Sequence, residues 1–302
     1  MLDLAERILE VIEIADIVFW PIAMDFKYKD LEAIGGGGID VAFYNGSVRN
    51  SEHEHLARVL RKRSKILIAF GTCACYGGIP GLANVSDRDE IFRVVYRETP
   101  STVNPQLTSP TTSMKIGDVT LTLPEFYDSV KPLNEVVDVD YYIPGCPPPI
   151  ELIGQAIELI KSYKLPPRGS VIGPRYPLCE VCKRRRDERI KIKHVKRVYE
   201  GRPDPDLCFL DQGYICLGPA TRAGCKGEEG GRCLDVNMPC RGCMGPPDGI
   251  KDQGARMISA LASVMDLETP PEKLTEMIKD PLGTFYRFTL PSSILIRRVI
   301  KK

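Results

Sequence analysis

The sequence lacks several features that would place it in a broad class at once. No run of 18 apolar residues occurs among its 302 residues, so no transmembrane helix is expected. The first 16 residues, MLDLAERILEVIEIAD, carry acidic side chains within an amphipathic pattern that a signal peptide does not have. The formal net charge is only +1, so global charge does not favour nucleic acid or a membrane as a partner. We expect a cytoplasmic protein without a membrane span.

Two other familiar signals are missing. The glycine run at 35–38 lacks the spacing of a phosphate-binding loop and the Lys-Ser/Thr that would follow it, so an ordinary loop is predicted. His53 and His55 stand two residues apart in SEHEH, which would send them to different faces of a helix. A surface helix start is the better interpretation there than a metal site.

What the sequence does contain is cysteine. Eleven cysteines cannot all pair as disulfides, and a cytosol disfavours disulfides, so metal binding is the favoured use. Only Cys73, Cys75 and Cys146 lie in the first 178 residues, and the other eight fall between Cys179 and Cys243.

The first half alternates helix and strand signals, which predicts an α/β fold with a parallel sheet between helices. Apolar periodicity predicts helices over 2–15, 51–62 and 150–163, and Ser86 with Asp89 fits a capping box for a helix over 87–98. Strands are expected at 16–20, 39–45, 65–70 and 139–143, whereas 100–135 looks rich in loops.

Cys73 and Cys146 each come just after a predicted strand. The carboxyl ends of parallel strands share one edge of the sheet, so these two cysteines could converge on one ligand. Two buried free cysteines are the simpler alternative. Cys75 is predicted to be a packing residue.

The segment 164–177 is predicted to be a linker between two domains, 1–165 and 166–302. Beyond it only 252–265 and 270–279 have clear helical periodicity, while glycine, proline and cysteine are frequent. Metal binding can stabilise such an irregular domain.

The eight clustered cysteines form the pattern Cys179-x2-Cys182-x25-Cys208-x7-Cys216-x8-Cys225-x7-Cys233-x6-Cys240-x2-Cys243. Eight thiolates can form two four-cysteine sites, which hold either zinc or an iron–sulfur cluster. Spacing alone decides neither the metal nor the grouping. The loosely spaced single cysteines favour clusters over zinc ribbons.

The motifs GTCACYGGIPG, YIPGCPP, LCEVC, ICLGPATRAGC, PCRGCMGP and GTFYRFTLP together resemble the small subunit of nickel–iron hydrogenases. The most similar type is the cytoplasmic, methyl-viologen-reducing kind that partners heterodisulfide reductase. The resemblance implies a flavodoxin-like domain that binds no flavin, followed by a cysteine-rich iron–sulfur domain.

The resemblance also implies ligand sets. Cys179, Cys182, Cys208 and Cys216 match the distal cluster; Cys225, Cys233, Cys240 and Cys243 match the medial one; Cys73 and Cys146 match two proximal ligands. Two 4Fe–4S clusters are thus expected in residues 166–302. A third, proximal cluster needs further ligands, because the family's N-terminal strand with its C-x2-C pair is expected to be missing ahead of residue 2, through a misassigned start or a truncation. The alternative is a genuine loss of that strand, with the proximal cluster absent.

The implied function is electron transfer without catalysis by this chain. Expected partners are a nickel–iron large subunit, a 2Fe–2S linker subunit and heterodisulfide reductase subunits. One alternative is an electron conduit in a heterodisulfide-reductase-like complex without hydrogenase activity, which Asn45 favours because relatives often carry an acid there. Another is a zinc-stabilised structural protein.

A basic run, KRRRDERIKIKHVKR at 183–197, follows Cys182 directly. It is either a solvated surface or a collar that steers an acidic redox partner. Nucleic-acid binding is disfavoured, since no aromatic interleaving or known motif accompanies the run.

Overall fold

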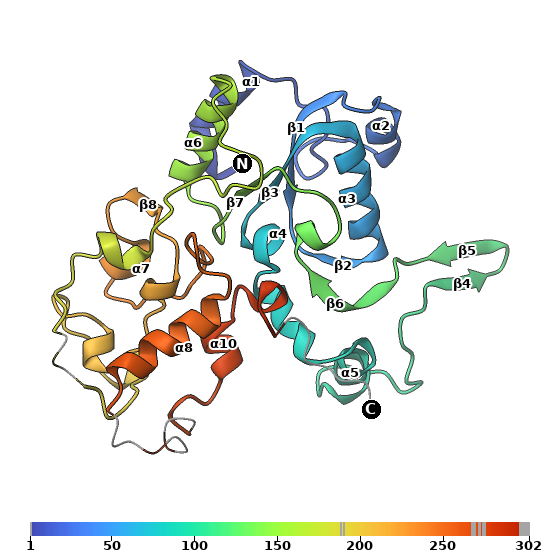
Figure 1. Cartoon of the computed structure of the whole chain (residues 1–302). Coiled ribbons are helices and arrows are strands. Elements are labelled where there is room, and N and C mark those ends of the chain that lie inside the picture. Colours follow the sequence, from blue (N-terminus) through green and yellow to red (C-terminus); the bar gives the residue numbers. More distant parts are fainter. Residues whose placement is uncertain are drawn as a thin grey trace.

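The computed structural model describes residues 2–295 except 188, 190, 267–269, 271, 272, 274 and 275. The N-terminal half is built around a small sheet, and the C-terminal half packs beside it (Figure 1). None of the helices in this described part is long and apolar enough to cross a membrane.

The sheet of the N-terminal half is parallel, as predicted. Its strands are β1 (Ile39–Asn45), β3 (Ser64–Phe70) and β7 (Tyr141–Ile143), in the order β1–β3–β7. The helix α3 (Ser51–Arg63) shares one apolar core with the sheet, and α6 (Ile150–Lys161) shares the other. The central strand β3 is buried along most of its length because both faces are covered. The expected α/β class is therefore confirmed.

The helices of this half begin where local chemistry favours a start. The side chain of Asn50 caps α3 by accepting from the His53 N–H at 2.8 Å. The cap of α5 (Arg88–Arg93) is Asp87, which accepts from the Glu90 N–H at 2.8 Å, so the predicted capping box at Ser86 and Asp89 is wrong by one residue. The predicted helix over 87–98 continues beyond α5 as a wider π-turn, η3 (Val94–Glu98).

Other predictions for this half need correction. Residues 16–20 form no strand, since no neighbouring strand pairs with them, and Phe19 packs against the core that α3 shares with the sheet. The expected helix over 2–15 is a 3-10 segment, η1 (Leu2–Arg7), followed by α1 (Ile8–Ile12). Shorter helical pieces are α2 (Tyr28–Ala33), α4 (Thr72–Tyr76), η2 (Ile79–Val85) and η4 (Leu133–Glu135).

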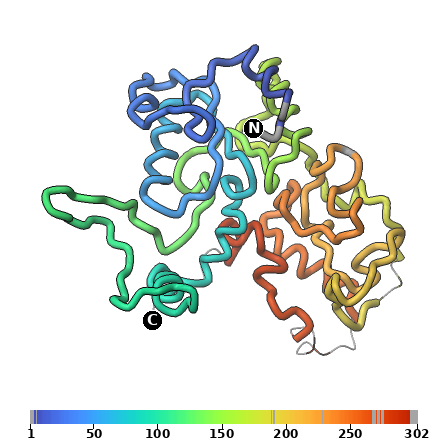
Figure 2. The backbone as a smooth tube through the Cα atoms, turned by 180° about the vertical axis from the view of Figure 1, so that it is seen from behind, coloured from blue at the N-terminus to red at the C-terminus, as the bar shows by residue number. Residues whose placement is uncertain are grey.

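Residues 100–135 contain three strands where loops were expected. The strand β6 (Phe126–Lys131) pairs antiparallel with β2 (Val48–Asn50). The strands β4 (Ser113–Ile116) and β5 (Val119–Thr122) form a separate hairpin. The hairpin extends away from the body of the molecule in both views (Figures 1 and 2).

One face of this hairpin is apolar. The cross-strand pairs Met114–Leu121 and Ile116–Val119 alternate with the polar pairs Ser113–Thr122 and Lys115–Thr120. All four apolar side chains are more than half exposed. A two-stranded ribbon is marginal by itself in water, and an exposed apolar face is typical of a surface that another protein covers.

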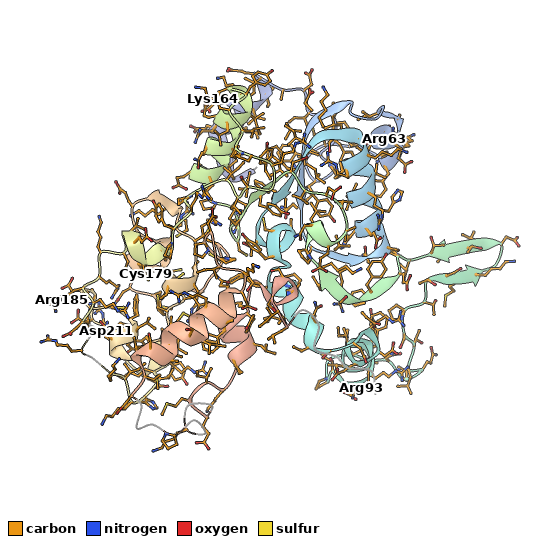
Figure 3. The ribbon with its side chains drawn as sticks, in the orientation of Figure 1. Arg63, Arg93, Lys164, Cys179, Arg185 and Asp211 are labelled. Carbon is orange, nitrogen blue, oxygen red and sulfur yellow. The ribbon has the colours of Figure 1, made fainter. Side chains whose placement is uncertain are left out.

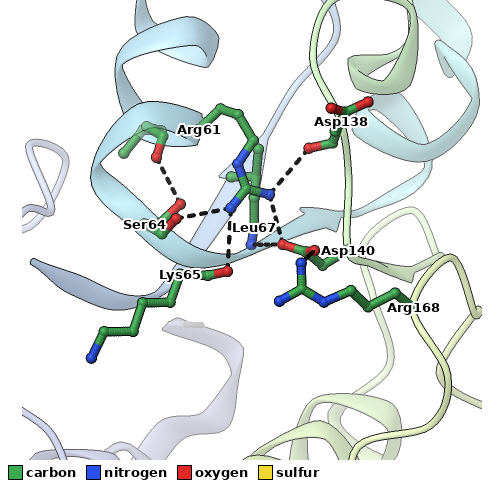
Figure 4. A network of polar contacts seen from close by, with 8 residues as sticks. Arg61, Ser64, Lys65, Leu67, Asp138, Asp140 and Arg168 are labelled. Carbon is green, nitrogen blue, oxygen red and sulfur yellow. Dashed lines mark hydrogen bonds and ion pairs between the residues drawn. The ribbon is translucent and has the colours of Figure 1, made fainter. Parts of the chain in front are cut away.

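The buried carboxylate of Asp140 connects strand β3 with two arginines outside the sheet (Figure 4). Asp140 accepts from the Leu67 N–H at 2.8 Å and pairs with Arg61 and Arg168, each at 2.6 Å. Burial alone would raise the pKa of Asp140, but these hydrogen bonds and the two positive charges outweigh it and hold the pKa below its ordinary value.

The segment 164–177 follows the edge of the sheet. The Ile172 N–H donates to the Tyr142 carbonyl at 2.8 Å, and the Tyr142 N–H donates to that of Ser170 at 3.1 Å. Ile172 is buried in the same core as α6. The segment is thus packed along β7, and the domain boundary at 165–166 stays a prediction.

The C-terminal half is irregular, as expected from its composition. Its longest helix is α8 (Gln253–Val264), which confirms the helix predicted at 252–265. Much of the predicted helix 270–279 lies outside the described residues. The other elements are short: η5 (Leu178–Val181), η6 (Val198–Glu200), η7 (Leu210–Gln212), η8 (Gly218–Ala220), β8 (Cys225–Glu228), α7 (Arg232–Asp235), α10 (Pro281–Phe285) and η9 (Leu290–Ser292).

Candidate iron–sulfur sites

The structure brings four cysteines to one cavity at the end of the C-terminal half that lies away from the sheet. Figure 3 places Cys179 there, with Arg185 and Asp211 nearby. The cysteines that line the cavity are Cys179, Cys182, Cys208 and Cys216. We call them the distal cysteines. Around them are mostly apolar side chains, among them Leu178, Phe209 and Leu234.

Short 3-10 turns position these thiols. Pro177 precedes η5, which carries Cys179, and the Cys182 N–H donates to the Cys179 carbonyl at 3.3 Å. Gly218, at the start of η8, lies against the thiols: a Cβ there would stand 3.0 Å from the Cys179 Sγ. A larger residue there would press against this thiol.

Burial disfavours the ionised form of three distal thiols, those of Cys179, Cys208 and Cys216. Burial, followed by the neighbouring thiols of Cys216, Cys182 and Cys208, raises the pKa of Cys179 to about 12. Burial raises the pKa of Cys216 to about 11, although backbone N–H groups of Gly218 and Cys240 oppose the shift. Four thiols in one pocket therefore need a positively charged group before they can all become thiolates.

Arg184 has a different role from the one its place in the basic run suggests. Its guanidinium donates to the carbonyls of Asp204 at 2.7 Å and Leu207 at 3.0 Å, and to the Asn237 side chain at 2.6 Å. It also stacks on the Phe209 ring at 3.8 Å. Arg184 thus fixes the loop that leads into Cys208.

Of the other four cysteines of this half, Cys225, Cys233 and Cys243 act on one another's thiols. The thiol of Cys243 is under the electrostatic influence of Cys225 and Cys233, which contributes, after burial, to a pKa of about 12. Cys240 stands between the two groups: its N–H donates to the Cys216 Sγ at 3.3 Å, and Cys216 and Cys243 both act on its thiol. We call Cys225, Cys233, Cys240 and Cys243 the medial cysteines.

Cys73 and Cys146 lie at the shared edge that was predicted for them. Cys73 is in α4, directly after β3, and Cys146 follows β7. Burial, then the Cys146 thiol, raises the pKa of Cys73. A Cβ on Gly78 would stand 2.4 Å from the Cys73 Sγ, so glycine is required beside this thiol. Pro291, the last residue of the motif GTFYRFTLP, packs against the segment that follows Cys73. It occupies the space that a Cβ of Gly77 or Gly81 would need.

Thr72 ties this edge to the medial cysteines. Its N–H donates to the Gly145 carbonyl at 2.9 Å, its hydroxyl accepts from the Gly145 N–H at 2.9 Å, and the hydroxyl donates to the Cys243 carbonyl. Sequence reasoning missed Thr72, because its partners lie 73 and 171 residues away. The Cys146 N–H is close enough to the Cys243 thiol to lower its pKa.

The three groups therefore form a row. The Thr72 hydroxyl, next to Cys73, donates to the Cys243 carbonyl, and the Cys240 N–H donates to the Cys216 Sγ, so each group is joined to the next by a hydrogen bond. Cys75 takes no part: its buried thiol donates to the Ala69 carbonyl at 3.4 Å, as a packing residue would.

A single metal ion finds no site in the described part of the chain. No three Cys, His, Asp or Glu side chains there are arranged to hold one ion. Four thiolates around zinc stand about 2.3 Å from one point. The cysteines fit a larger group better, one that offers each thiolate its own metal atom.

Comparison with known proteins gives the following similarities. Residues 1–160 match the family described as NADH ubiquinone oxidoreductase, 20 Kd subunit. The iron-sulfur subunit of the F420-non-reducing hydrogenase of Archaeoglobus profundus is 42% identical over 100% of this chain and 94% of its own length. A subunit of the F420-non-reducing hydrogenase of Methanothermobacter thermautotrophicus is 38% identical over 99% of this chain and 92% of its own length.

Among solved structures, an NAD+-reducing [NiFe]-hydrogenase in the H2-reduced state contains a chain that is 29% identical. The match covers 53% of the present chain and 81% of that chain, with a TM-score of 0.43.

Proposed function

The chain belongs to the family of these F420-non-reducing hydrogenase subunits, and we propose on that basis that it carries electrons through iron–sulfur clusters for a hydrogenase-type large subunit. The observation that supports this most directly is the row of three cysteine groups, each of which is joined to the next by a hydrogen bond.

We assign one 4Fe–4S cluster to the distal cysteines and one to the medial cysteines. The shared cavity of the four distal cysteines supports the first assignment. The mutual influence of Cys225, Cys233 and Cys243 supports the second. Cys73 and Cys146 are proposed as two ligands of a third cluster at the sheet edge.

A bound cluster would supply reversible acceptance of one electron, with a potential set by burial and by hydrogen bonds to sulfur. The chain itself supplies the thiolates, a largely apolar surround, and backbone N–H groups directed at sulfur. The N–H of Cys240 is one such group and contacts the Cys216 Sγ at 3.3 Å. These groups favour the ionised thiolates that a cluster requires.

A large subunit is proposed to cover the N-terminal half. Exposed apolar side chains are concentrated there, including the four on the β4–β5 hairpin. Beyond residue 165 the described part of the chain has only five large apolar side chains that are exposed, namely Tyr199, Val236, Ile258, Ile294 and Leu295. This asymmetry is typical of a protein with one extensive interface. A 2Fe–2S linker subunit and heterodisulfide reductase subunits are proposed as acceptors at the distal end.

The test is metal and sulfide analysis of the full chain, purified without oxygen, together with visible absorption and electron paramagnetic resonance. We expect at least eight iron atoms and matching sulfide, because two 4Fe–4S clusters contain four irons each. Replacing Cys179→Ser should reduce the iron content by one cluster. Cys75→Ser is the matched control and should leave iron unchanged, since Cys75 packs against Ala69. Stoichiometric zinc without sulfide would refute the proposal.

A further inference from the structure

A second, polar pocket lies next to the distal cysteines. It is lined by Arg186, Leu210, Pro219, Arg256, Ser259, Ala260 and Ser263. Leu210 and Pro219 also line the cavity of the distal cysteines, so the two hollows share a wall. The arginines come from segments 70 residues apart in sequence, and only the packing of α8 against the loop after Cys182 brings them together.

The two guanidinium groups at this pocket make no hydrogen bond or ion pair with the part of the chain that the structure describes. The charge of Arg186 does act on the nearby thiols of Cys179 and Cys208, where it opposes the rise of their pKa. Other arginines of the same basic run are used: Arg184 holds the loop before Cys208, and Arg189 pairs with Asp187 at 2.9 Å. Arg186 and Arg256 are both exposed, so they remain available to an incoming group.

The rest of the rim adds to this positive character. Lys191 donates to the Ser263 carbonyl at 2.8 Å, which holds a third cation beside the pocket. The nearby carboxylates are already engaged: Asp211 accepts from the Asp187 N–H at 2.7 Å, and Asp266 pairs with Lys193 at 3.4 Å. The Ser263 hydroxyl donates to the Ala260 carbonyl, whereas that of Ser259 has no partner among the described residues.

Two arginines and a free hydroxyl around one hollow suit an oxyanion, because a guanidinium binds a carboxylate through two parallel hydrogen bonds. The position narrows the choice of anion. The pocket borders the distal cysteines, where an electron would leave the chain. A protein whose anionic side chain binds in the pocket would therefore lie next to the distal cysteines.

We propose that this pocket receives a carboxylate side chain of the acidic protein that accepts electrons at the distal cysteines. The inference rests on the proposed function and adds to it the chemistry of the partner. It also makes one of the two predicted roles of the basic run more specific. Docking uses Arg186 of the run together with Arg256 of α8, and the run's overall charge is secondary.

The test measures electron transfer from the full chain, purified without oxygen and chemically reduced, in a stopped-flow instrument. An acidic plant-type 2Fe–2S ferredoxin serves as the protein acceptor and a neutral quinone dye as the second acceptor. Arg186→Glu and Arg256→Glu are compared with Lys183→Glu, which reverses an exposed charge of the same run outside the pocket lining. Iron content and paramagnetic resonance confirm that each variant retains its clusters.

At low ionic strength we expect each pocket variant to lower the second-order rate constant with ferredoxin about tenfold, and Lys183→Glu less than about twofold. Transfer to the neutral dye should not change. Phosphate should slow the wild-type reaction with ferredoxin more than chloride does at equal ionic strength, and Arg256→Glu should remove that difference.

Equal effects of all three substitutions would mean that the rate depends on the overall positive charge of this surface. That result would refute docking in the pocket. Unchanged ferredoxin rates in the pocket variants would overturn it too, even if phosphate binds there. If the wild-type chain contained clusters but reduced neither acceptor, or contained none, the proposed function would fail and this inference with it.

Discussion

Replacing Thr72 with valine tests whether the hydroxyl of this residue joins the sheet edge to the medial cysteines. The side chain is only 1% exposed, and its hydroxyl serves the Gly145 N–H and the Cys243 carbonyl together. Valine has nearly the same shape but no hydroxyl. Both backbone groups would then stay buried without a partner.

The expected loss of stability follows from the cost of those two groups. A buried polar group left without its hydrogen bond costs about 1–3 kcal/mol, so the two groups together should cost about 2–6 kcal/mol in Thr72→Val. Thr72→Ser keeps the hydroxyl and removes one methyl group, which costs about 1 kcal/mol. For a protein of this size, a loss of about 1 kcal/mol lowers Tm by about 2–4 °C.

The assay is thermal unfolding of the cluster-loaded chain without oxygen, at one fixed scan rate. Thr72→Val should lower Tm by about 4–24 °C and Thr72→Ser by no more than about 4 °C. The paramagnetic resonance of the medial site should change in the valine variant alone, because its Cys243 carbonyl has lost its donor. Equal Tm values and equal spectra for the two variants would show that the hydroxyl does not join these segments.

Three further predictions concern other parts of the chain. Cys233→Pro should convert the medial site to a 3Fe cluster with a new signal in the oxidised protein and leave the distal site intact; Cys233 lies in the first turn of α7, where proline is tolerated. Asp140→Asn should lower the free energy of unfolding by about 2–4 kcal/mol at neutral pH, since it leaves Arg61 without its buried partner. Because the pKa of Asp140 is lowered by folding, this difference is complete above the ordinary carboxyl pKa near 4 and shrinks as pH falls through the lower folded value. Val119→Asp with Leu121→Asp should weaken binding of the large subunit at least about tenfold in a pull-down titration, with cluster content unchanged.

Each of these has a matched control or a contrary outcome. Asp138→Asn should be neutral, because only the backbone carbonyl of Asp138 contacts Arg61. Thr120→Asp, on the polar face of the hairpin, should leave binding of the large subunit intact. Loss of every cluster in Cys233→Pro would mean that the cysteines are grouped differently. A stability difference at Asp140 that persists unchanged at low pH would contradict the ion-pair explanation.

Much of this protein could be predicted from local sequence patterns. The strands at 39–45, 65–70 and 139–143 and the helices beside them are strongly periodic or continuously apolar, and their burial depends on little else. Cys73 and Cys146 follow two of these strands directly, so their common edge could be predicted as well. Prediction failed where a strand depends on pairing with another part of the chain. Residues 16–20 look like a strand but have no neighbouring strand to pair with. The strands β4, β5 and β6 were missed because they lie in a stretch without strong periodicity.

The sequence by itself determined the α/β class, the eight clustered cysteines and their division from the first half, because these are properties of residue type and spacing. Only the tertiary structure decided which thiols share a cavity, that Cys240 lies between two groups, that Arg184 fixes the loop before Cys208, and that Arg186 meets Arg256. The physical reason is distance along the chain. The residues concerned are tens of positions apart in segments without periodicity, so their contacts come from how short 3-10 turns pack around α8 and the sheet, which no local pattern records.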